Sequence, residues 1–397
     1  MLKIGVLIDQ LSIGGVAKVA IEEVRYLKKL GYQADLLVLL RTGQKKKIKL
    51  TDNEITIKFL SDKFPAIFKK SFKFPFFSYF SSFHITSPFV IDRVIKKDDY
   101  DLIISHGTYT CLSAIRLLKK LNIPYIAYIW DPVTYIQKKV YSNTPLRILF
   151  PILKPVSYFI DNFIVKNSIA VITGSKVHYK NLKSFDEDKV FIVYPGCKNI
   201  KTYQNRREKI ILSVTRWDSG KNPDFLLKIM KRVNELLKAS NKVYSRYKLI
   251  IAGGWLRDYE KTKFKNRIIS ENLDNKVKVL GYIDKNKLEK LYSKAKVLIY
   301  PNFEAFGMTG LEAASFGCPI IFPKGSGVTD LFEHEKHGFF PEEGNIDEFV
   351  LYLSRILLDN NLALEMGKSA YDVAKNYTFY EHAKKLDEII KKLFGKE

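Results

Sequence analysis

The sequence predicts an α/β protein made of two doubly wound domains, each with a mainly parallel sheet covered by helices. The chain has 397 residues, more than one ordinary hydrophobic core organises. Short apolar, β-branched runs alternate with amphipathic helical patterns, which is the order of βαβ units. A polar, basic stretch at 197–209 separates two such series. We therefore expect an N-terminal domain over 1–199 and a C-terminal domain over 200–379.

The first series begins with KIGVLI (3–8), a predicted strand. Gly14 and Gly15 then open a predicted helix that ends at Gly31. Apolar residues recur on one face of this helix, at Val16, Ala20, Val24 and Leu27. The other elements predicted for this domain are strands at 34–40, 100–105, 124–129 and 170–175 and a helix around 110–121.

The second series follows the basic stretch and repeats the same alternation. Its predicted strands are 209–214, 247–253, 276–281, 296–301 and 318–323, with helices between them such as 285–295 and 309–316. The last segment, 380–397, contains an amphipathic helix that can pack against either domain, including back onto the first.

Composition restricts the class of protein. The chain is 46% hydrophobic and 13% aromatic, which is typical of a globular protein. Cys111, Cys197 and Cys318 are scattered and form neither a disulfide framework nor a metal-binding spacing, which fits a reducing compartment. MLKIGVLIDQ is typical of a first core strand and not of a signal peptide. We therefore expect a cytoplasmic protein.

The formal net charge of +24 has two interpretations. It indicates contact with a polyanion such as anionic lipid, phosphate groups or nucleic acid, or it reflects a lysine-rich composition alone. No nucleic-acid-binding motif is present, so nucleic acid is not an expected partner. The aromatic stretches 74–91 and 146–165 contain prolines and polar residues and do not predict membrane spans. They are interpreted as buried helices or, with their flanking lysines, as a surface for an anionic membrane.

The segment PNFEAFGMTGLEAASFG (301–317) carries two carboxylates, Glu304 and Glu312, without a nearby lysine or arginine. It follows a predicted strand and runs into a helix, so it lies where open α/β sheets bind ligands. Backbone N–H groups of Gly307, Met308 and Thr309 at a helix start suit a diphosphate. Carboxylates suit the hydroxyl groups of a sugar or ribose. Together these groups predict a nucleotide-sugar site; alternatively, Glu304 is solvated and Glu312 favours the helix dipole.

A second motif, SVTRWDSGKN (213–222), follows the first strand of the second series. Arg216 and Lys221 flank a turn there, and Pro223 starts the next helix. Two cations on one strand-end loop suit a diphosphate leaving group. A solvated basic loop is the alternative in so lysine-rich a chain.

In combination, RWDSGKN and PNFEAFGMTGLEAASFGCPII resemble the second-domain signature of glycosyltransferase family 4, whose members are retaining enzymes of the GT-B fold. The resemblance implies two Rossmann-like domains with parallel sheets that face each other across a cleft. It also implies that Arg216 and Lys221 hold the donor diphosphate, that Glu312 binds the donor ribose and that Glu304 contacts or supports the donor sugar. The turn at Gly281, Tyr282 and Ile283 would then lie beside the nucleobase.

The first domain shows a looser resemblance. Gly14 and Gly15 resemble the family's glycine-rich loop after the first strand, and His106 resembles a histidine that approaches the transferred sugar. Taken alone, a histidine after a buried strand is more often a structural residue with its hydrogen bonds satisfied. Trp130 and Asp131 stand where many members carry a second histidine, so this departure concerns the acceptor side.

The residues expected to bind the donor are Gly14, Gly15, Arg216, Lys221, Gly281, Tyr282, Ile283, Glu304, Phe306, Gly307, Met308, Thr309 and Glu312, and those expected to act in transfer are His106, Arg216, Lys221 and Glu304. We find no Asp-x-Asp motif or His/Cys cluster suited to a metal, and neither a metal nor another cofactor is expected besides the nucleotide-sugar co-substrate.

The expected function is retaining, metal-independent transfer of a sugar to a glycan or lipid-linked acceptor, at the cytoplasmic face of a membrane if the aromatic surface binds lipid. Three alternatives stay open: a nucleotide-sugar epimerase, a glycan phosphorylase, and a basic membrane- or nucleic-acid-binding scaffold with a degenerate fold.

Overall fold

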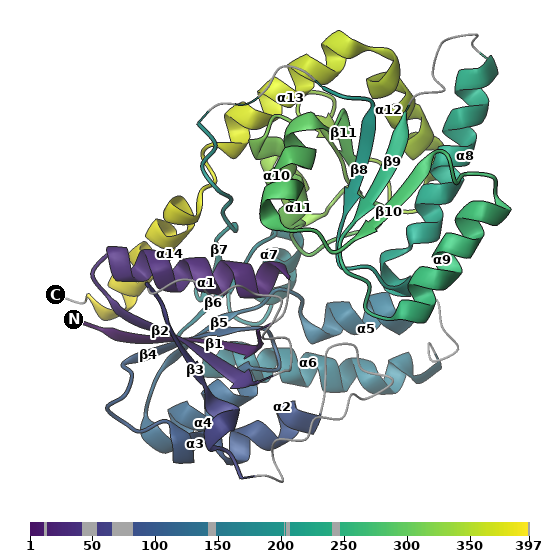
Figure 1. The fold of residues 1–397 in the computed structure, drawn as a ribbon. Coiled ribbons are helices and arrows are strands. Elements are labelled where there is room, and N and C mark those ends of the chain that lie inside the picture. Colours follow the sequence, from purple (N-terminus) through teal and green to yellow (C-terminus); the bar gives the residue numbers. More distant parts are fainter. Residues whose placement is uncertain are drawn as a thin grey trace. The chain divides into compact units, whose positions relative to one another are not determined.

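The computed structural model describes the chain except for residues 12–13, 42–53, 66–81, 142–147, 202, 204–206, 240–246 and 396–397. The chain divides into two compact units (Figure 1). The first contains Met1–Pro195 together with Phe379–Glu397, and the second contains Gly196–Thr378. Each unit has a parallel sheet with helices packed on it, so the predicted α/β fold class is confirmed.

The first unit is built on a seven-stranded sheet in the order β3-β2-β1-β4-β5-β6-β7. All its neighbouring strands are parallel. The chain moves outward from β1 to β3 and then crosses to β4, so the strand order reverses between β1 and β4. Ligands of open sheets bind outside the carboxyl ends of strands at such a reversal. The strands are β1 (Lys3–Gln10), β2 (Gln33–Leu40), β3 (Thr56–Phe59), β4 (Leu102–His106), β5 (Tyr125–Tyr128), β6 (Ala170–Thr173) and β7 (Val190–Ile192).

The C-terminal helix returns to the first unit. Helix α14 (Phe379–Phe394) packs against α1 (Gly15–Lys29), and the rings of Tyr26 and Tyr380 meet edge to face at 6.1 Å. The Tyr32 hydroxyl also donates to Asp387 at 2.6 Å. Residues more than 350 positions apart in the sequence are therefore in contact within one unit. The other helices of this unit are α2 (Ser82–Thr86), α3 (Ile91–Val94), α4 (Cys111–Leu121), α5 (Val133–Tyr141), α6 (Phe150–Asn167) and α7 (Lys176–Lys183).

The second unit is built on a six-stranded sheet in the order β10-β9-β8-β11-β12-β13, with parallel neighbours throughout. The strand order reverses between β8 and β11, which places the loops after these two strands at the reversal point. The strands are β8 (Ile210–Val214), β9 (Lys248–Ala252), β10 (Val277–Gly281), β11 (Val297–Ile299), β12 (Ile320–Ile321) and β13 (Gly338–Phe339).

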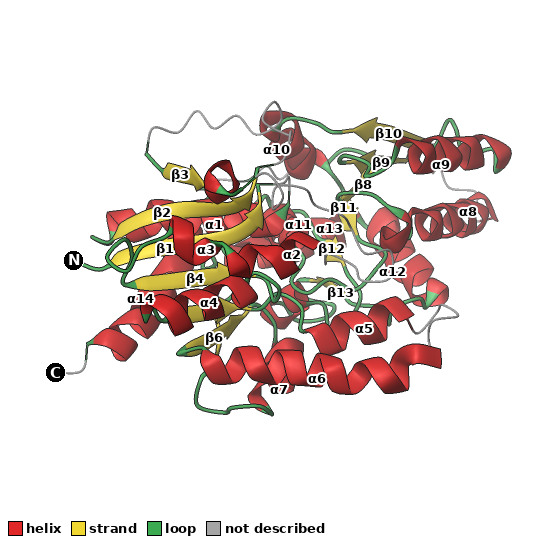
Figure 2. Cartoon of the chain, turned by 90° about the horizontal axis from the view of Figure 1, so that it is seen from below, coloured by secondary structure: helices red, strands yellow, loops and turns green. Residues whose placement is uncertain are grey.

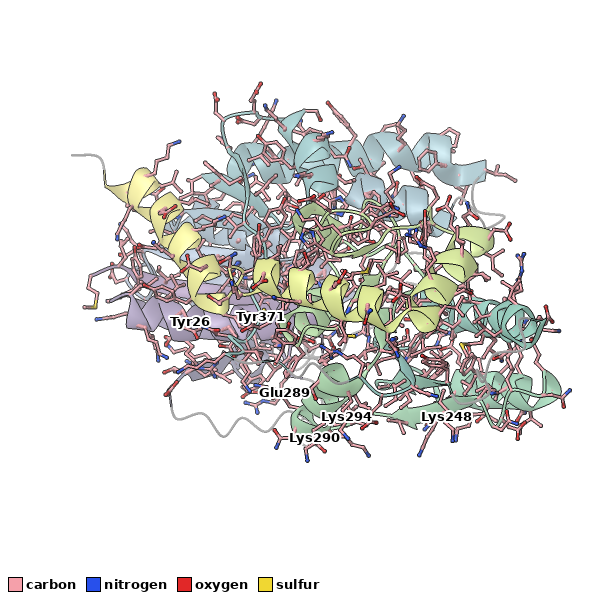
Figure 3. All side chains as sticks on the ribbon, turned by 90° about the horizontal axis from the view of Figure 1, so that it is seen from above. Tyr26, Lys248, Glu289, Lys290, Lys294 and Tyr371 are labelled. Atoms are coloured by element: carbon pink, nitrogen blue, oxygen red, sulfur yellow. The ribbon has the colours of Figure 1, made fainter. Side chains whose placement is uncertain are left out.

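The helices of the second unit bury one face and leave the other in solvent. Figure 3 labels Lys290 and Lys294 on the outer side of α10, whereas Tyr292 of the same helix is buried. This alternation is the amphipathic pattern that holds a helix against a sheet. The helices are α8 (Pro223–Ala239), α9 (Asp258–Ser270), α10 (Lys285–Lys294), α11 (Met308–Ser315), α12 (Ile346–Leu358) and α13 (Asn360–Ala374).

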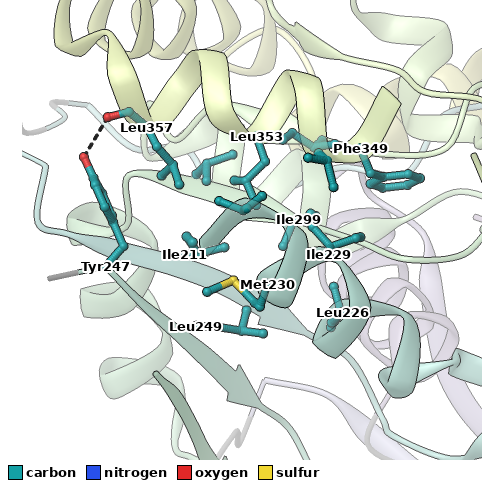
Figure 4. Close-up of a cluster of buried hydrophobic side chains, with 14 of the residues drawn as sticks. Ile211, Leu226, Ile229, Met230, Tyr247, Leu249, Ile299, Phe349, Leu353 and Leu357 are labelled. Carbon is teal, nitrogen blue, oxygen red and sulfur yellow. Dashed lines mark hydrogen bonds between the residues drawn. The ribbon is translucent and has the colours of Figure 1, made fainter. Parts of the chain in front are cut away.

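The core of the second unit fills the space between β8, β9 and β11 and the helices α8 and α12 (Figure 4). Ile211, Leu249 and Ile299 from the strands and Leu353 from α12 are almost fully buried. Tyr247 closes one edge, where its hydroxyl donates to the carbonyl of Leu357 at 3.0 Å. This rigid core fixes the strand ends from which the functional loops leave.

The predicted strands and helices are found within a few residues of their expected bounds, but the three short strands β3, β7 and β13 were not predicted. They contain four, three and two residues, too few to show an alternating pattern. Residues 74–81 of the first aromatic stretch and 146–147 of the second lie outside the described residues. Figure 2 shows the helical and strand content of both units. No helix in the described part of the chain has the length and apolar character needed to cross a bilayer.

Candidate functional site

Lys221 and Glu304 meet at the carboxyl edge of the second sheet. Lys221 lies in a 3-10 turn, Ser219–Lys221, after β8, and Glu304 lies in the loop after β11. The Lys221 ammonium pairs directly with the Glu304 carboxylate, and the two side chains keep 24% and 21% of their surface exposed. The sequence motifs are 83 positions apart, and adjacent parallel strands bring them together. Glu304 is therefore not a bare carboxylate, as the local sequence suggested, and its cation comes from the predicted second loop.

Tyr300 extends this pair into the core. Its hydroxyl donates to the Glu304 carboxylate and shares a hydrogen bond with the Thr215 hydroxyl, 2.8 Å between the oxygens. Burial, followed by the nearby Glu304 charge, raises the pKa of Tyr300 well above its usual value, so the phenol stays protonated. Glu304 is thus held by a buried neutral donor on one side and by a partly exposed cation on the other.

Two glycines shape the loop between Glu304 and α11. Gly307 has a φ of +96°, a left-handed conformation that favours glycine. A Cβ atom at Gly307 or at Gly310 would stand 2.9 Å from the ring of Phe322. Phe322 in turn stacks on Tyr300, with ring centroids 4.9 Å apart. The glycines of FGMTG therefore allow the helix start to lie directly on the aromatic pair behind the Lys221–Glu304 contact.

Backbone hydrogen bonds hold the Glu304 loop in place. The Gly327 N–H donates to the Glu304 carbonyl at 3.2 Å, and the Val328 N–H donates to the Phe306 carbonyl at 2.6 Å. The Glu304 N–H donates to the Ser326 hydroxyl at 3.2 Å. The loop after β12 thus braces the loop after β11, which pre-organises the groups that would face a ligand.

Glu312 lies on α11, in its second turn and not at its first residue. Its carboxylate accepts a hydrogen bond from the buried Tyr292 hydroxyl of α10 at 2.9 Å. Burial and the adjacent Glu312 charge raise the pKa of Tyr292 well above its ordinary value. Tyr292 therefore acts as a permanent donor that orients Glu312.

Arg207 joins the ends of these two helices. Its guanidinium donates to the carbonyls of Tyr292 and Ser293 at 3.1 and 2.8 Å, and to that of Phe316 at 2.7 Å. A cation suits the C-terminal end of a helix, where carbonyl groups lack partners. The stretch 197–209 was interpreted only as a basic connection, and the structure shows that Arg207 in it anchors α10 and α11.

The other residues of the second unit that were predicted for donor binding lie along the same sheet edge. Arg216 follows β8 and is half-buried, and among the described residues its guanidinium has no hydrogen-bond or ion-pair partner. The turn Gly281–Ile283 follows β10, with Gly281 at a φ of +69° and Tyr282 48% exposed. Met308 and Thr309 are half-buried in the first turn of α11, and Phe306 is buried. Within the predicted set, Lys221 and Glu304 form a direct ion pair.

His106 ends β4 in the first unit and is fully buried. Its Nε2 atom lies 2.6 Å from one oxygen of Glu23, and the other oxygen of Glu23 lies 2.7 Å from Nε2 of His382. The Nδ1 atom of His382 is 2.9 Å from the carbonyl of Tyr194. In the structure His106 is part of an internal Glu23–His106–His382 cluster, so its role toward a sugar stays a prediction.

Trp130 and Asp131 follow β5, next to His106. The Trp130 ring stacks on Tyr128 at 4.7 Å, and the His106 ring lies 6.2 Å from it. Asp131 is 33% exposed at its side chain and lies 3.1 Å from Nε2 of the buried His178. Gly14 and Gly15 stand after β1 at the start of α1, on the same carboxyl edge as His106.

Sequence reasoning missed Glu23, His178, His382, Tyr292, Tyr300 and Arg207. Glu23 carried a detectable signal, because it falls beside Ala20, Val24 and Leu27 on the apolar face of α1 and is 0% exposed. A carboxylate on a buried face requires a partner. The partner histidines come from β4 and α14, which no local pattern connects.

The carboxyl edge of the second sheet offers two cations and two carboxylates beside the start of a helix. Each carboxylate accepts a hydrogen bond from a buried tyrosine. This set suits a ligand with both phosphate and hydroxyl groups. The part of the chain that the structure describes contains no group of three or more His, Cys, Asp or Glu side chains arranged to hold a metal ion.

The comparisons with known protein families cover most of the chain. Residues 13–198 match the family described as Glycosyltransferase Family 4, and residues 198–373 match Glycosyl transferases group 1. An uncharacterized glycosyltransferase of Haemophilus influenzae is 26% identical over 95% of this chain and 96% of its own length. An α-1,4-N-acetyl-D-galactosaminyltransferase of Campylobacter jejuni, named for an undecaprenol diphosphate-linked substrate, is 26% identical over 73% of this chain and 74% of its own.

Solved structures show the same fold. The sucrose-phosphate synthase of Thermosynechococcus elongatus superposes with a TM-score of 0.81 at 17% identity and covers 100% of both chains. The Anabaena protein HepE, solved in complex with UDP and glucose, superposes with a TM-score of 0.74 at 14% identity over 99% of this chain and 100% of its own. The described architecture is therefore the GT-B fold.

Proposed function

Because this chain belongs to the family 4 glycosyltransferases, we propose that it moves a sugar from a nucleotide-sugar donor to a glycan or lipid-linked acceptor with retention of anomeric configuration. The observation that carries the proposal is the Lys221–Glu304 pair, held by Tyr300 at the strand-order reversal of the second sheet. This is the position in which an open α/β sheet binds its ligand.

The donor diphosphate is assigned to the cationic side of this edge. During transfer the bond between the anomeric carbon and the leaving phosphate oxygen breaks, and negative charge develops on the nucleoside diphosphate. Lys221 and Arg216 supply fixed positive charge, and the first turn of α11 supplies backbone N–H groups. On donor binding, Lys221 would exchange part of its contact with Glu304 for the diphosphate.

The donor hydroxyls are assigned to the two carboxylates. Glu312, oriented by Tyr292, binds the ribose, and Glu304, oriented by Tyr300, positions the transferred sugar. A carboxylate that already accepts one fixed hydrogen bond has a defined direction for its remaining lone pairs. We assign Glu304 a positioning role and no covalent intermediate.

The acceptor class is supported by the Campylobacter jejuni relative, which is named for a lipid-linked glycan substrate. The donor class is supported by HepE, which was solved with UDP and glucose.

A thermal-shift panel of UDP-, GDP- and ADP-sugars tests donor binding, because a ligand that binds only the folded state raises its melting temperature. We expect one nucleotide class to stabilise the wild type and Lys221→Ala to lose most of that shift. Lys228→Ala, which removes an exposed lysine of α8, is the control and should keep it. Equal stabilisation of all three proteins, or stabilisation of none by any nucleotide, would contradict the assigned site.

The reaction itself is tested with the donor that the panel identifies. Nucleoside diphosphate release should depend on a glycan or lipid-linked acceptor, and NMR of the product should show the donor's anomeric configuration. Addition of EDTA should leave the rate unchanged, because Arg216 and Lys221 take the place of a metal at the leaving group. An inverted product, or a rate that EDTA abolishes and Mg²⁺ restores, would overturn that part of the proposal.

A further inference from the structure

Helix α6 carries an unusual concentration of exposed apolar side chains for a helix of an α/β unit. From Ile148 to Phe159 every residue is exposed except Phe150, Leu153 and Ser157. The large apolar side chains in this range and their exposed fractions are Ile148 76%, Leu149 44%, Ile152 69%, Val156 51%, Tyr158 53% and Phe159 65%. A third of all strongly exposed large apolar residues of the described chain thus lie within 12 positions.

Four of these side chains form one stripe. Leu149, the N-cap of α6, and Ile152, Val156 and Phe159 within the helix recur at intervals of three, four and three residues, which places them on the same face. The opposite face attaches the helix to the first unit, through Ser157, Asp161, Ile164 and Val165, which are buried. Figure 2 shows α6 running beside α5 at an edge of the unit. We call the stripe of Leu149, Ile152, Val156 and Phe159 the α6 face.

The only acidic residue of this region is already engaged inside the protein. Between Asp131 and Asp186 the sequence contains eight lysines and arginines and a single acid, Asp161. Asp161 accepts hydrogen bonds from the N–H groups of Val133 and Thr134, both at 2.9 Å, and from the Thr134 hydroxyl at 2.7 Å. Its carboxylate therefore caps the start of α5 and does not offset the surface cations. Lys154, Lys166, Lys176 and Lys180 are exposed.

We propose that the α6 face docks this protein on an anionic lipid bilayer, with Ile152, Val156 and Phe159 entering the interface and the surrounding cations contacting lipid phosphates. Apolar residues on one side of a surface helix combined with basic flanks are the requirements of an interfacial helix. A second copy of the chain is a poorer occupant, because face-to-face pairing of two identical surfaces would bring these like charges together.

The inference goes beyond the proposed transfer reaction and is tested without donor or acceptor. Wild-type protein is sedimented with vesicles of phosphatidylcholine alone and of phosphatidylcholine mixed with phosphatidylglycerol, at low and high salt. We expect binding to the mixed vesicles, weakened by salt, and little binding to the neutral ones. For the double variant Ile152→Ser/Phe159→Ser, the partition coefficient onto the mixed vesicles should be at least about tenfold lower, since two exposed apolar anchors are lost.

Control variants test whether vesicle binding depends on the α6 face or is non-specific hydrophobic adsorption. Ile269→Ser/Leu351→Ser removes two side chains of similar exposure, 63% and 54%, from the second unit and should bind as the wild type does. Lys154→Glu should weaken binding to the mixed vesicles only. Circular dichroism and thermal melting check that each variant is folded.

The proposal is overturned if wild-type protein does not bind the mixed vesicles, or if both double variants lose binding equally. It is also overturned if sedimentation equilibrium shows that the α6 variant only breaks a dimer while its vesicle binding is unchanged. A negative transfer assay would not contradict the membrane proposal, because vesicle binding is measured without donor or acceptor.

Discussion

Glu23 in the first unit and Glu304 in the second are both carboxylates held by basic partners, yet their surroundings differ. Glu23 has no exposed surface and contacts two histidines from β4 and α14. Glu304 keeps 21% of its side chain exposed and contacts one lysine and one tyrosine. A sealed carboxylate can only hold the fold together, whereas an accessible one can exchange its partner for a ligand.

The energetic roles of the two carboxylates differ in the same way. Burial acts to raise the pKa of Glu23, but the two histidines outweigh it and lower the pKa to about 2. Glu23 is thus an ion whose removal leaves buried partners unsatisfied. The Lys221–Glu304 pair is partly solvated, so its loss costs the fold little. Three experiments test this contrast, in order of the expected change in free energy.

Replacing Glu23 by alanine should give the largest effect. We expect Glu23→Ala to lower the free energy of unfolding by about 3–5 kcal/mol, because removing one partner of a buried charged cluster strands the others. Urea denaturation at neutral pH measures it. Glu22→Ala on the same helix removes a partly exposed partner of Arg25, which keeps its second partner Glu54, and should cost less than about 1 kcal/mol. Equal losses for the two variants would remove the distinction between fully buried and partly exposed carboxylates.

Lys221→Ala should act on the reaction and not on the fold. Loss of one charge-stabilising group at a leaving oxygen typically costs about 100- to 1,000-fold in turnover. We expect such a fall in kcat, with a change in unfolding free energy below about 1 kcal/mol. Steady-state kinetics with the donor from the nucleotide panel, paired with urea denaturation, check both. A variant that unfolds readily but keeps its turnover would reverse the roles assigned to the two regions.

Acid titration tests whether Glu23 is ionised in the folded protein. The folded pKa of Glu23, about 2, lies below its ordinary 4.5, so its stabilising contribution is full above about pH 4.5 and is lost as pH falls toward 2. The stability difference between wild type and Glu23→Gln should therefore shrink by about 1.4 kcal/mol per pH unit in that window. Denaturation curves from pH 5 to 3 measure it. A constant difference would indicate that Glu23 is not ionised in the native protein.

The sequence was informative wherever function is carried by contiguous residues. Arg216, Lys221, Glu304 and Glu312 lie within two short motifs that follow strands, and strand ends at a reversal of order are binding positions. The sequence also shows the glycines of FGMTG, but it does not show why glycine is required there. Only the packing of Phe322 under Gly307 and Gly310 explains why no side chain fits there.

The contacts that orient these residues join distant parts of the chain and leave no local pattern. Lys221 and Glu304 are 83 positions apart, Arg207 and Phe316 are 109 apart, and Glu23 and His382 are 359 apart. By itself the sequence determined the two-domain α/β class, the parallel sheets and the motif residues, because periodicity and strand-end loops are local properties. Tertiary structure alone decided which carboxylate is sealed by histidines and which stays within reach of a ligand, because burial depends on the elements that the fold brings together.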